Sequence, residues 1–433
     1  MDRLAHLGQS LNVAIIGAGY AGLAAAVTLA QQGMNVTVYE ASKTLGGRAR
    51  RVQLGDLALD NGQHLLLGAY TETLRLVKLV APDLNAWARQ PLTLHTLGGM
   101  QLRAPRLPAP FNTLIALLTA TGLCTAERYA ALRFMLVQRV KRYKLSSDCS
   151  VASLLEQYRQ PATLIHKLWA PLCVAALNTP PATASAQVFL NVLRDSLVQR
   201  RADSDMILPT CDLSALFPDP AAAFVQAHGG KVICECTVNT IVAEGSGFSL
   251  AGQHYTHVIS AVGPHQAARL LVDLPALKPL RDTLAQLRYQ PIATVYLQYP
   301  PSVKLAENML GLSGEFAQWV FDRSRTHAQH GLLAVVISAE GRYRTLSHTE
   351  LADQVDRELR EALGTLPALL WHQVIIEKRA TFSCDVGVQR PPQITLQPDF
   401  YLAGDYTDSD YPATLEAATR SGVKCAHLIL EHS

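Results

Sequence analysis

The segment Asn12-Val13-Ala14-Ile15-Ile16-Gly17-Ala18-Gly19-Tyr20-Ala21-Gly22 decides the fold of this chain. It reads as a short buried strand, a glycine turn and the start of a helix. Gly17 permits the tight turn, Gly19 lets the backbone approach a diphosphate, and Gly22 allows the helix to pack closely on the strand. Because the N-terminus of such a helix attracts anions, the segment predicts a dinucleotide-binding unit.

A second strand follows this helix and ends in an acidic residue. The helical pattern runs over residues 21–32, and Val36-Thr37-Val38-Tyr39 then reads as a buried strand. Glu40 ends that strand roughly 20 residues after the glycine turn, where a carboxylate can bind both hydroxyls of an adenosine ribose. A carboxylate there disfavours a 2′-phosphate. We therefore expect residues 17–22, Glu40 and Ala41 to contact a dinucleotide that lacks this phosphate.

The next segment, Leu45-Gly46-Gly47-Arg48-Ala49-Arg50, indicates which dinucleotide is bound. Its glycines let the backbone lie near the cofactor, and Arg48 offers a charged fork to the phosphates. The alternative for Arg48 is a solvated surface charge. This segment resembles the GGR segment of the flavin-containing amine oxidase and phytoene desaturase superfamily. The resemblance implies that the cofactor is FAD and that Gly47 and Arg48 contact it.

A second motif stands near the C-terminus. Tyr401-Leu402-Ala403-Gly404-Asp405 reads as an apolar strand ending in Gly-Asp, and Thr414-Leu415-Glu416-Ala417-Ala418 opens a helical pattern. Both resemble the second FAD motif of the superfamily, which implies that the Asp binds the ribityl-phosphate and that the helix N-terminus stabilises reduced flavin. The contacts implied by this resemblance are Gly404, Asp405, Thr414, Leu415 and, near the adenine, Val238.

Two departures from the amine oxidases narrow the prediction. Covalently flavinylated members carry a Cys shortly before the closing helix, but residues 408–413 contain none, so we expect noncovalent FAD. Amine oxidases also tend to place a Lys close to flavin N5. The comparable strand, residues 289–296, contains no Lys, which disfavours amine oxidation.

A narrower resemblance covers nearly the whole chain from Leu11 onwards. Several segments are similar to the squalene-associated FAD enzymes, the hydroxysqualene dehydroxylases of bacterial squalene and hopanoid synthesis. These segments are Asp60–Tyr70, Leu168–Pro181, Leu190–Asp195 and Asp205–Pro209. The resemblance implies that reduced FAD converts hydroxysqualene, a C30 isoprenoid, into squalene and water. We expect acid-assisted loss of the allylic hydroxyl and hydride transfer from flavin N5 to the allylic cation.

This reaction needs a proton donor near the leaving hydroxyl. The resemblance implies that the segment containing Gly62, Gln63 and His64 runs past the flavin ring. His64 is the first candidate, because the pKa of histidine lies near neutrality, and the alternative is a structural hydrogen bond. Asp60 and Tyr411 are the other candidates for a catalytic role.

Composition sets limits on class and location. The chain has 433 residues, of which 49% are hydrophobic and 17% charged, and a formal net charge of +3. This charge is too small and its cations too scattered to predict nucleic-acid binding. Residues 1–11 are too short and polar for a secretory leader. The eight cysteines form no paired framework or metal motif, so we expect a cytoplasmic protein with reduced thiols and no metal.

One apolar segment raises the question of membrane contact. Residues 107–126 contain no charged residue, but prolines and threonines interrupt them and the apolar run is short for a bilayer span. Either this segment lies on the inner face of the cytoplasmic membrane as a peripheral helix, or it packs in the core. Lipid contact would let a C30 substrate enter without crossing water.

The order of predicted elements indicates an α/β fold with two interleaved domains. A Rossmann-type FAD domain is expected from residues 1–90, 211–275 and 375–433. Residues 91–210 and 276–374 are expected to form a substrate domain with a mixed sheet and an apolar helical part. The helical pattern covers about residues 91–210, with proline breaks at 105–110, Pro171 and 180–181, and residues 229–238 turn into a strand.

Two rival functions follow from the same features. A carotenoid-type or phytoene-type desaturase, or another oxidase, would use the flavin in the opposite direction. A lipid carrier would hold FAD without turnover. No second dinucleotide fingerprint is present, so a dehydroxylase would take its electrons from a diffusing reduced nicotinamide or from a separate reductase.

Overall fold

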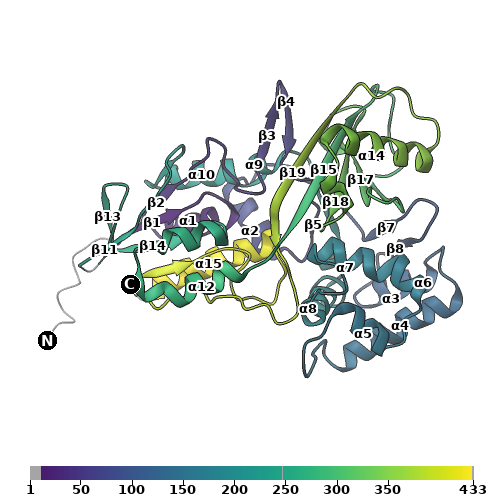
Figure 1. Ribbon diagram of the computed structural model, residues 1–433, viewed down its shortest axis with the longest axis horizontal. Coiled ribbons are helices and arrows are strands. Elements are labelled where there is room, and N and C mark those ends of the chain that lie inside the picture. The colour runs from purple at the N-terminus through teal and green to yellow at the C-terminus, as the bar shows by residue number, and fades with distance from the viewer. Residues whose placement is uncertain (1–10, 246, 432–433) are drawn as a thin grey trace.

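The two ends of the chain build one lobe together, and most of the middle builds the other (Figure 1). The structure is a computed structural model that describes residues 11–245 and 247–431. Residues 1–10, in which no secretory leader is predicted, lie outside the described residues. The predicted fold class, a Rossmann-type domain interleaved with a sheet-plus-helix domain, is confirmed.

A five-stranded parallel sheet forms the centre of the first lobe, in the order β10-β2-β1-β14-β20. Its strands are β1 (Asn12–Ile16), β2 (Asn35–Tyr39), β10 (Lys231–Ile233), β14 (His257–Ser260) and β20 (Phe400–Leu402). Because β1 is the central strand, its glycine turn opens at the carboxyl edge of the sheet, where open α/β sheets bind their ligands.

Both faces of this sheet are covered, as parallel sheets require. Val13 and Ile15 pack against helices on one face, whereas Ala14 and Ile16 belong to the core of the other face. The helices of this lobe are α1 (Tyr20–Gln31), α9 (Leu213–Leu216), α10 (Pro218–Ala227), α11 (Pro264–Leu270), α12 (Lys278–Gln286) and α15 (Leu415–Glu431). Helices α1 and α15 cross so closely that a Cβ on Gly422 would lie 2.0 Å from the Ala21 carbonyl oxygen. The N-terminal and C-terminal motifs are thereby held together.

The second lobe contains a five-stranded antiparallel sheet in the order β16-β17-β18-β15-β19. Its strands are β15 (Tyr289–Gln298), β16 (Met309–Gly311), β17 (Trp319–Asp322), β18 (Leu332–Ser338) and β19 (Trp371–Phe382). Ala293, Val295 and Leu297 face the core under helix α14 (His348–Leu363), whereas Ile292 and Tyr296 belong to the opposite face. That opposite face is turned towards the functional site.

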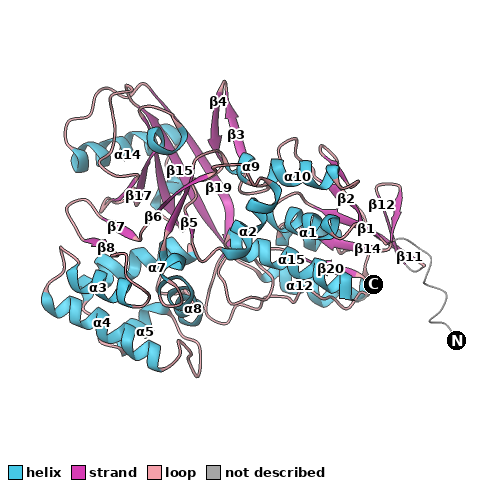
Figure 2. Ribbon diagram, turned by 180° about the vertical axis from the view of Figure 1, so that it is seen from behind, coloured by secondary structure: helices cyan, strands magenta, loops and turns pink. Residues whose placement is uncertain are grey.

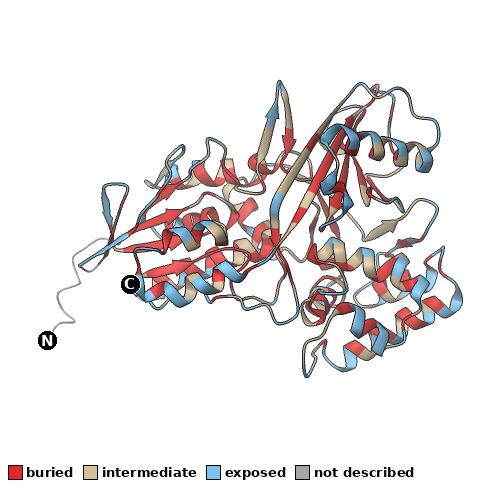
Figure 3. Ribbon diagram, viewed as in Figure 1, coloured by how far each residue is buried: buried red, intermediate tan, exposed pale blue. Residues whose placement is uncertain are grey.

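A layer of helices completes the second lobe (Figure 2). These helices are α3 (Phe111–Thr119), α4 (Thr125–Val140), α5 (Val151–Gln157), α6 (Ala162–Leu164), α7 (Ala170–Leu177) and α8 (Ala186–Leu197). Pro171 was expected to break a helix but does not, because the π-helical turn Ile165–Trp169 joins α6 to α7 and Pro171 occupies the first turn of α7. Figure 3 shows that the outer faces of this layer are exposed.

The remaining elements are short. The strands are β3 (Arg51–Leu54), β4 (Leu57–Asp60), β5 (Leu66–Leu67), β6 (Trp87–Gln90), β7 (Thr93–His95), β8 (Gln101–Arg103), β9 (Met206–Pro209), β11 (Val242–Glu244), β12 (Gly247–Leu250) and β13 (Gln253–Tyr255). The remaining helices are α2 (Thr71–Val80), the short α13 (Arg323–His327), and the 3₁₀ turns Arg201–Ser204, Pro275–Leu277 and Arg342–Thr345.

The structure corrects two local predictions. Residues 91–110 were predicted to be helical but contain β7 and β8. The strand predicted through Val238 ends at Ile233, since Glu235 adopts φ 55° and leaves the strand conformation. Two of the predicted domain boundaries do not coincide with the ends of packed elements. Position 375 lies inside β19, which pairs with β15 along its length, and α12, which was assigned to the substrate domain, packs against α11 of the first lobe.

Candidate functional site

A cavity of about 1460 Å³ lies between the two lobes. This volume exceeds the range of roughly 300–1,000 Å³ that is typical of pockets for one small molecule. The glycine turns of the N-terminal motifs line one end of the cavity, and apolar side chains of the second lobe line the other. The cavity therefore has room for a large cofactor and a second molecule beside it.

The glycine turn after β1 has the geometry that its sequence predicts. Gly17 adopts φ 104°, a conformation that favours glycine. A Cβ on Gly22 would lie 1.9 Å from the Gly17 carbonyl oxygen, so only glycine allows α1 to pack this closely on the turn. Gly19 and Gly47 face each other, because a Cβ on Gly47 would lie 3.3 Å from the Gly19 Cα. This end of the cavity is consequently lined by bare backbone.

Most of the predicted cofactor contacts line the cavity. They are Gly17, Gly19, Tyr20, Ala21, Glu40, Ala41, Gly47, Arg48, Gly62, Gln63, His64, Val238, Gly404, Asp405, Thr414 and Leu415. Ala18 and Gly22, which were also predicted, do not line it. The Ala18 N–H donates to Glu40 Oε2 at 2.8 Å, and Gly22 packs against Gly17. The Tyr20 hydroxyl donates to the Leu213 carbonyl at 3.1 Å.

The Glu40 carboxylate joins the glycine turn to the loop after β2. Its Oε2 accepts from the Ala18 N–H and its Oε1 accepts from the Ser42 N–H, each at 2.8 Å. Each carboxylate oxygen has a further lone pair. Because Glu40 also lines the cavity, it keeps the capacity to accept from the hydroxyls of a ribose.

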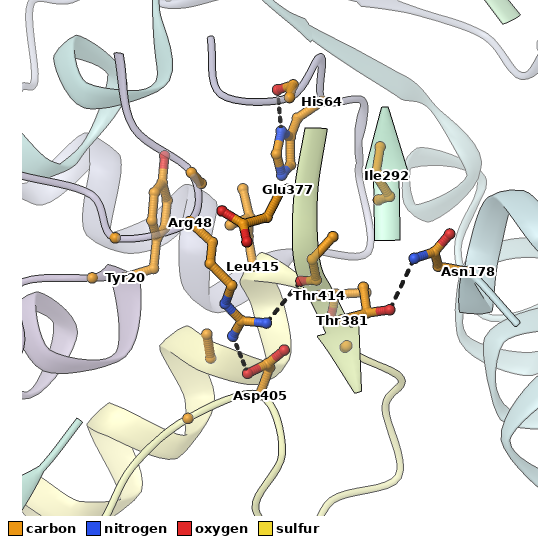
Figure 4. A pocket seen from close by; sticks show the side chains of 18 of the residues that line it. Tyr20, Arg48, His64, Asn178, Ile292, Glu377, Thr381, Asp405, Thr414 and Leu415 are labelled. Atoms are coloured by element: carbon orange, nitrogen blue, oxygen red, sulfur yellow. Dashed lines mark hydrogen bonds and ion pairs between the residues drawn. The ribbon is translucent and has the colours of Figure 1, made fainter. Parts of the chain in front are cut away.

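Arg48 lies where the two ends of the chain meet (Figure 4). Its Nη2 donates to the Asp405 carboxylate in an ion pair, and its Nη1 donates to the Ala380 carbonyl at 2.7 Å. Arg48 is therefore not a free surface charge. It connects the GGR segment to the Gly-Asp motif and to β19, and its guanidinium lines the cavity.

The N-terminus of α15 also opens on the cavity. Thr414 precedes the helix, and its hydroxyl accepts from the Ala417 N–H at 3.1 Å. Thr414 and Leu415 both line the cavity. The unpaired N–H groups of the first turn and the positive end of the helix dipole favour negative charge at this place.

His64 has a defined tautomer. Its Nδ1 lies 2.6 Å from the Gly62 carbonyl oxygen, which can only accept, so Nδ1 carries the proton. Burial lowers the pKa of His64 below its ordinary value, although the bond to Gly62 and the charge of Asp60 oppose this shift. The neutral ring leaves Nε2 as an acceptor. His64 can donate a proton from Nε2 only after that atom has been protonated.

The structure places Asp60, a candidate for a catalytic role, away from the cavity. This residue is buried behind the cavity wall and does not line the cavity. Its carboxylate accepts from Arg323 Nη1 at 3.1 Å and from the Leu213 N–H at 2.8 Å. Burial raises the pKa of Asp60 despite the neighbouring Arg323. Asp60 therefore joins elements of the two lobes and does not open on the cavity.

Tyr411 does line the cavity. The Arg420 guanidinium lies 5.2 Å from the centre of its ring, and burial raises the pKa of its hydroxyl. At neutral pH the phenol is therefore protonated. The structure keeps Tyr411 among the groups that can donate a hydrogen bond in the cavity.

Three polar residues of the wall were missed from the sequence. Asn178 ends α7 with φ 46°, and its Nδ2 donates to Thr381 Oγ1 at 2.9 Å. Glu377 Oε2 accepts from Asn61 Nδ2 at 3.1 Å. Figure 4 shows Glu377 and Thr381 on β19, with the imidazole of His64 directed towards Glu377. Asn178 lies in Leu168–Pro181, one of the segments of the narrower resemblance. In contrast, β19 carries no motif that could have indicated Glu377 or Thr381.

The far end of the cavity is apolar. Side chains from the second sheet, from α7 and α8, and from β7 and the residue before it form this end, namely Leu92, Leu94, Leu172, Ala175, Ala176, Val192, Leu193, Leu197, Ile292, Met309, Trp319, Phe321 and Val336. A chamber with this lining suits an apolar molecule. It lies beyond His64, so such a molecule would reach the middle of the cavity from the side opposite the glycine turns.

The residues present fit a flavin dinucleotide. The backbone turns at Gly17, Gly19 and Gly47 leave space that any Cβ would narrow, and Glu40 stands at the position expected of a ribose ligand. A helix N-terminus opens on the cavity at each motif, at Tyr20 for α1 and at Leu415 for α15. The motifs at both ends of the chain thus line one continuous site.

Known proteins resemble the chain along its full length. It is 29% identical over 435 residues to a hydroxysqualene dehydroxylase of Rhodopseudomonas palustris, covering 98% of this chain and 99% of that protein. It is 27% identical over 432 residues to a hydroxysqualene dehydroxylase of Zymomonas mobilis, covering 97% and 99%. An oxidoreductase structure from Methanosarcina mazei superposes with a TM-score of 0.76 at 16% identity, covering 97% of this chain and 100% of that one.

The family described as flavin containing amine oxidoreductase matches residues 20–430, a range that contains α1, the GGR segment and the Gly-Asp motif. The likeness to the Methanosarcina mazei structure supports the fold described above. The family match agrees with a flavin at the end of the cavity that the glycine turns line. The chain therefore belongs to the flavin-containing amine oxidoreductase family and is a flavin-dependent oxidoreductase.

Proposed function

We propose that this enzyme uses noncovalently bound reduced FAD to convert hydroxysqualene into squalene. The observation that carries this proposal is the single cavity that joins the glycine turns to an apolar chamber. A C30 isoprenoid alcohol needs such a chamber for its chain and needs its hydroxyl-bearing carbon at the junction with the cofactor. The names of the two bacterial relatives support this substrate.

The reaction balances without a further reactant. The C–O bond of the allylic alcohol breaks, and a proton from the protein leaves with the hydroxyl as water. Reduced FAD, when bound, supplies a hydride for the new C–H bond and becomes oxidised. The protein has to orient the alcohol, exclude water from the cationic carbon and deliver the proton.

We assign the proton delivery to His64. Its Nδ1–H is held by the Gly62 carbonyl, so the ring keeps Nε2 for the substrate side. Protonation of Nε2 produces an imidazolium, which donates to the leaving hydroxyl and returns to the neutral tautomer. Tyr411 supplies a second O–H group in the same cavity. Its protonated phenol can hold the hydroxyl by a hydrogen bond.

The lining of the cavity supports noncovalent FAD. Cys236 is the one cysteine among the described residues that line it, and it lies two positions before Val238, at the end proposed for the adenosine. Residues 408–413 before α15 contain no cysteine. Repeated turnover would need electrons from an external donor, either a reduced nicotinamide or a reductase protein.

One observation favours a second function, desaturation of an apolar polyene. The neutral form of His64 presents an acceptor at Nε2, and a desaturase needs a group that accepts a proton. The apolar chamber suits a carotenoid precursor as well. In that case the flavin would accept a hydride from the substrate.

Product analysis separates the two functions. Pre-reduced enzyme is incubated with hydroxysqualene without oxygen, oxidised enzyme is incubated with phytoene, and the products are identified by mass spectrometry. Dehydroxylation predicts squalene in the first incubation and unchanged phytoene in the second. The reverse pattern would assign the enzyme to the desaturases.

A further inference from the structure

Helix α3 (Phe111–Thr119) carries an exposed apolar face. Phe111 is 60% exposed and Leu118 is 47% exposed, with Ile115 between them. These positions have the spacing i, i+4 and i+7, so their side chains lie along one face of the helix. The opposite face is buried, through Asn112, Thr113, Ala116 and Leu117. A short helix with large apolar side chains turned outwards is unusual on a surface that meets only water.

The charges around α3 match an anionic surface. Residues 107–126 contain no charged side chain, and Arg103 and Arg106 are exposed just before them. Arg128 follows them, and its Nη1 donates to the Leu118 carbonyl at the end of the helix. The nearby Glu127 is buried and accepts from Thr163, so it does not offset these cations at the surface. The pattern of apolar face and flanking arginines is typical of helices that lie in the interface of anionic membranes.

The length of α3 limits how it can meet a bilayer. No helix within residues 11–245 and 247–431 is long and apolar enough to cross a membrane. A helix of 9 residues rises about 13–14 Å, less than half of a hydrocarbon core of about 30 Å. It can only lie along the surface.

The buried face of α3 rests on the wall of the cavity. Asn112 Nδ2 donates to Ser204 Oγ at 3.1 Å, and Thr113 Oγ1 donates to the Leu197 carbonyl at 3.2 Å. Both Leu197 and Ser204 line the cavity. The Asn112 Oδ1 is buried without a hydrogen-bond partner. Helix α3 therefore lies between the cavity and the exposed apolar face. The hydrogen bonds of Asn112 and Thr113 attach the helix to the cavity wall, although the Asn112 Oδ1 is left unsatisfied.

We propose that α3 binds the interface of an anionic lipid bilayer through Phe111, Ile115 and Leu118, and that the substrate passes from the bilayer beside α3 into the cavity. The lipid contact is inferred only from the exposed apolar face of α3 and the arginines beside it. The passage of substrate rests on the proposed function, because only an apolar isoprenoid needs to enter from the bilayer. The two parts are tested by different measurements.

Vesicle binding tests the lipid contact. The purified holoenzyme is sedimented with vesicles of phosphatidylcholine alone or mixed with phosphatidylglycerol. We expect binding that depends on phosphatidylglycerol and falls at least tenfold in the double variant F111S/L118S. The matched control is L370S/L396S, which removes two leucines of 60% and 75% exposure and should bind as the parent does. Equal binding of parent and F111S/L118S would overturn the proposal.

A conservative variant covers the case in which F111S/L118S does not fold. The fluorescence of Phe111→Trp, after subtraction of the parent spectrum, should shift to the blue with vesicles that contain phosphatidylglycerol. An unchanged spectrum would contradict the lipid contact. This readout does not depend on turnover, so it stays informative even if hydroxysqualene is not the substrate.

The passage of substrate is tested by its mode of delivery. F111S/L118S should turn over detergent-dispersed hydroxysqualene at the parent's rate but lose activity at least fivefold when hydroxysqualene is supplied in vesicles. Equal loss with both forms of substrate would contradict a role of α3 in entry. Absence of turnover in the parent would refute the proposed function and leave the vesicle-binding result intact.

Discussion

Arg48 and Asp405, separated by 357 positions in the sequence, form an ion pair in the floor of the cavity. Arg48 comes from the GGR segment near the N-terminus, and Asp405 follows β20 near the C-terminus. The pair joins the two motifs on which the prediction of FAD depends. The third partner, the Ala380 carbonyl, brings β19 of the second lobe to the same point.

Loss of this ion pair should weaken retention of FAD. Arg48→Ala leaves the largely buried Asp405 carboxylate without its cation, which costs about 1–3 kcal/mol. We expect the variant to elute from gel filtration with much less flavin per protein than the parent. Arg48→Lys keeps the charge without the fork and should lie between them. Full flavin content in Arg48→Ala would contradict this assignment.

The buried pair of Asp60 and Arg323 should act on stability and not on chemistry. Asp60→Asn leaves the fully buried Arg323 guanidinium without its counter-ion, a change that costs roughly 3–5 kcal/mol in buried pairs. Urea unfolding should show this loss. The rate of flavin reoxidation by substrate in the folded fraction should stay within about threefold of the parent, since Asp60 lies outside the cavity. A stable but inactive Asp60→Asn would restore Asp60 as a catalytic candidate.

The pH dependence follows from the lowered pKa of His64. Because burial lowers this pKa below its ordinary value near 6.5, His64 is neutral at neutral pH and the donating imidazolium is the minor form. The rate of dehydroxylation by pre-reduced enzyme should therefore rise as the pH falls, by up to roughly tenfold per pH unit until the pKa is reached. His64→Gln should be slow and independent of pH. A rate that rises with pH would instead indicate His64 as a proton acceptor.

Replacement by alanine should have different effects at Gly22, in the first turn of α1, and at Gly33, just after α1. Gly22→Ala would bring a Cβ within 1.9 Å of the Gly17 carbonyl oxygen and force α1 away from the glycine turn. We expect loss of FAD and a large fall in melting temperature. A Cβ on Gly33 meets nothing within 4 Å, so Gly33→Ala has only the strain of φ 74°, about 1 kcal/mol. Similar losses in both variants would show that the contact with Gly17 is not the cause.

The parts of the site that lie in continuous segments could be predicted from the sequence. The turn at Gly17, the acidic end of β2 at Glu40 and the Thr414 cap of α15 each need only local spacing and residue type. The parts that arise from long-range packing could not be predicted in this way. Glu377 and Thr381 reach the cavity because β19 pairs with β15, and the sequence of β19 shows no pattern that specifies this pairing.

The burial of Asp60 could not be predicted for a related reason. Its position next to the Gly62 segment placed it close to the flavin ring along the chain. Side chains alternate along a strand, and Asp60 ends β4, so neighbours in sequence need not share a face. The partner that makes Asp60 structural, Arg323, lies 263 positions away and could be identified only from the fold.

A single-turnover experiment tests the proposed reaction most directly. The enzyme with bound FAD is photoreduced without oxygen and mixed with hydroxysqualene in a stopped-flow cell, and flavin absorbance and squalene are measured together. Reductive dehydroxylation predicts that oxidised flavin appears with one squalene formed per flavin. Flavin that remains bound and reduced in the presence of hydroxysqualene would contradict it.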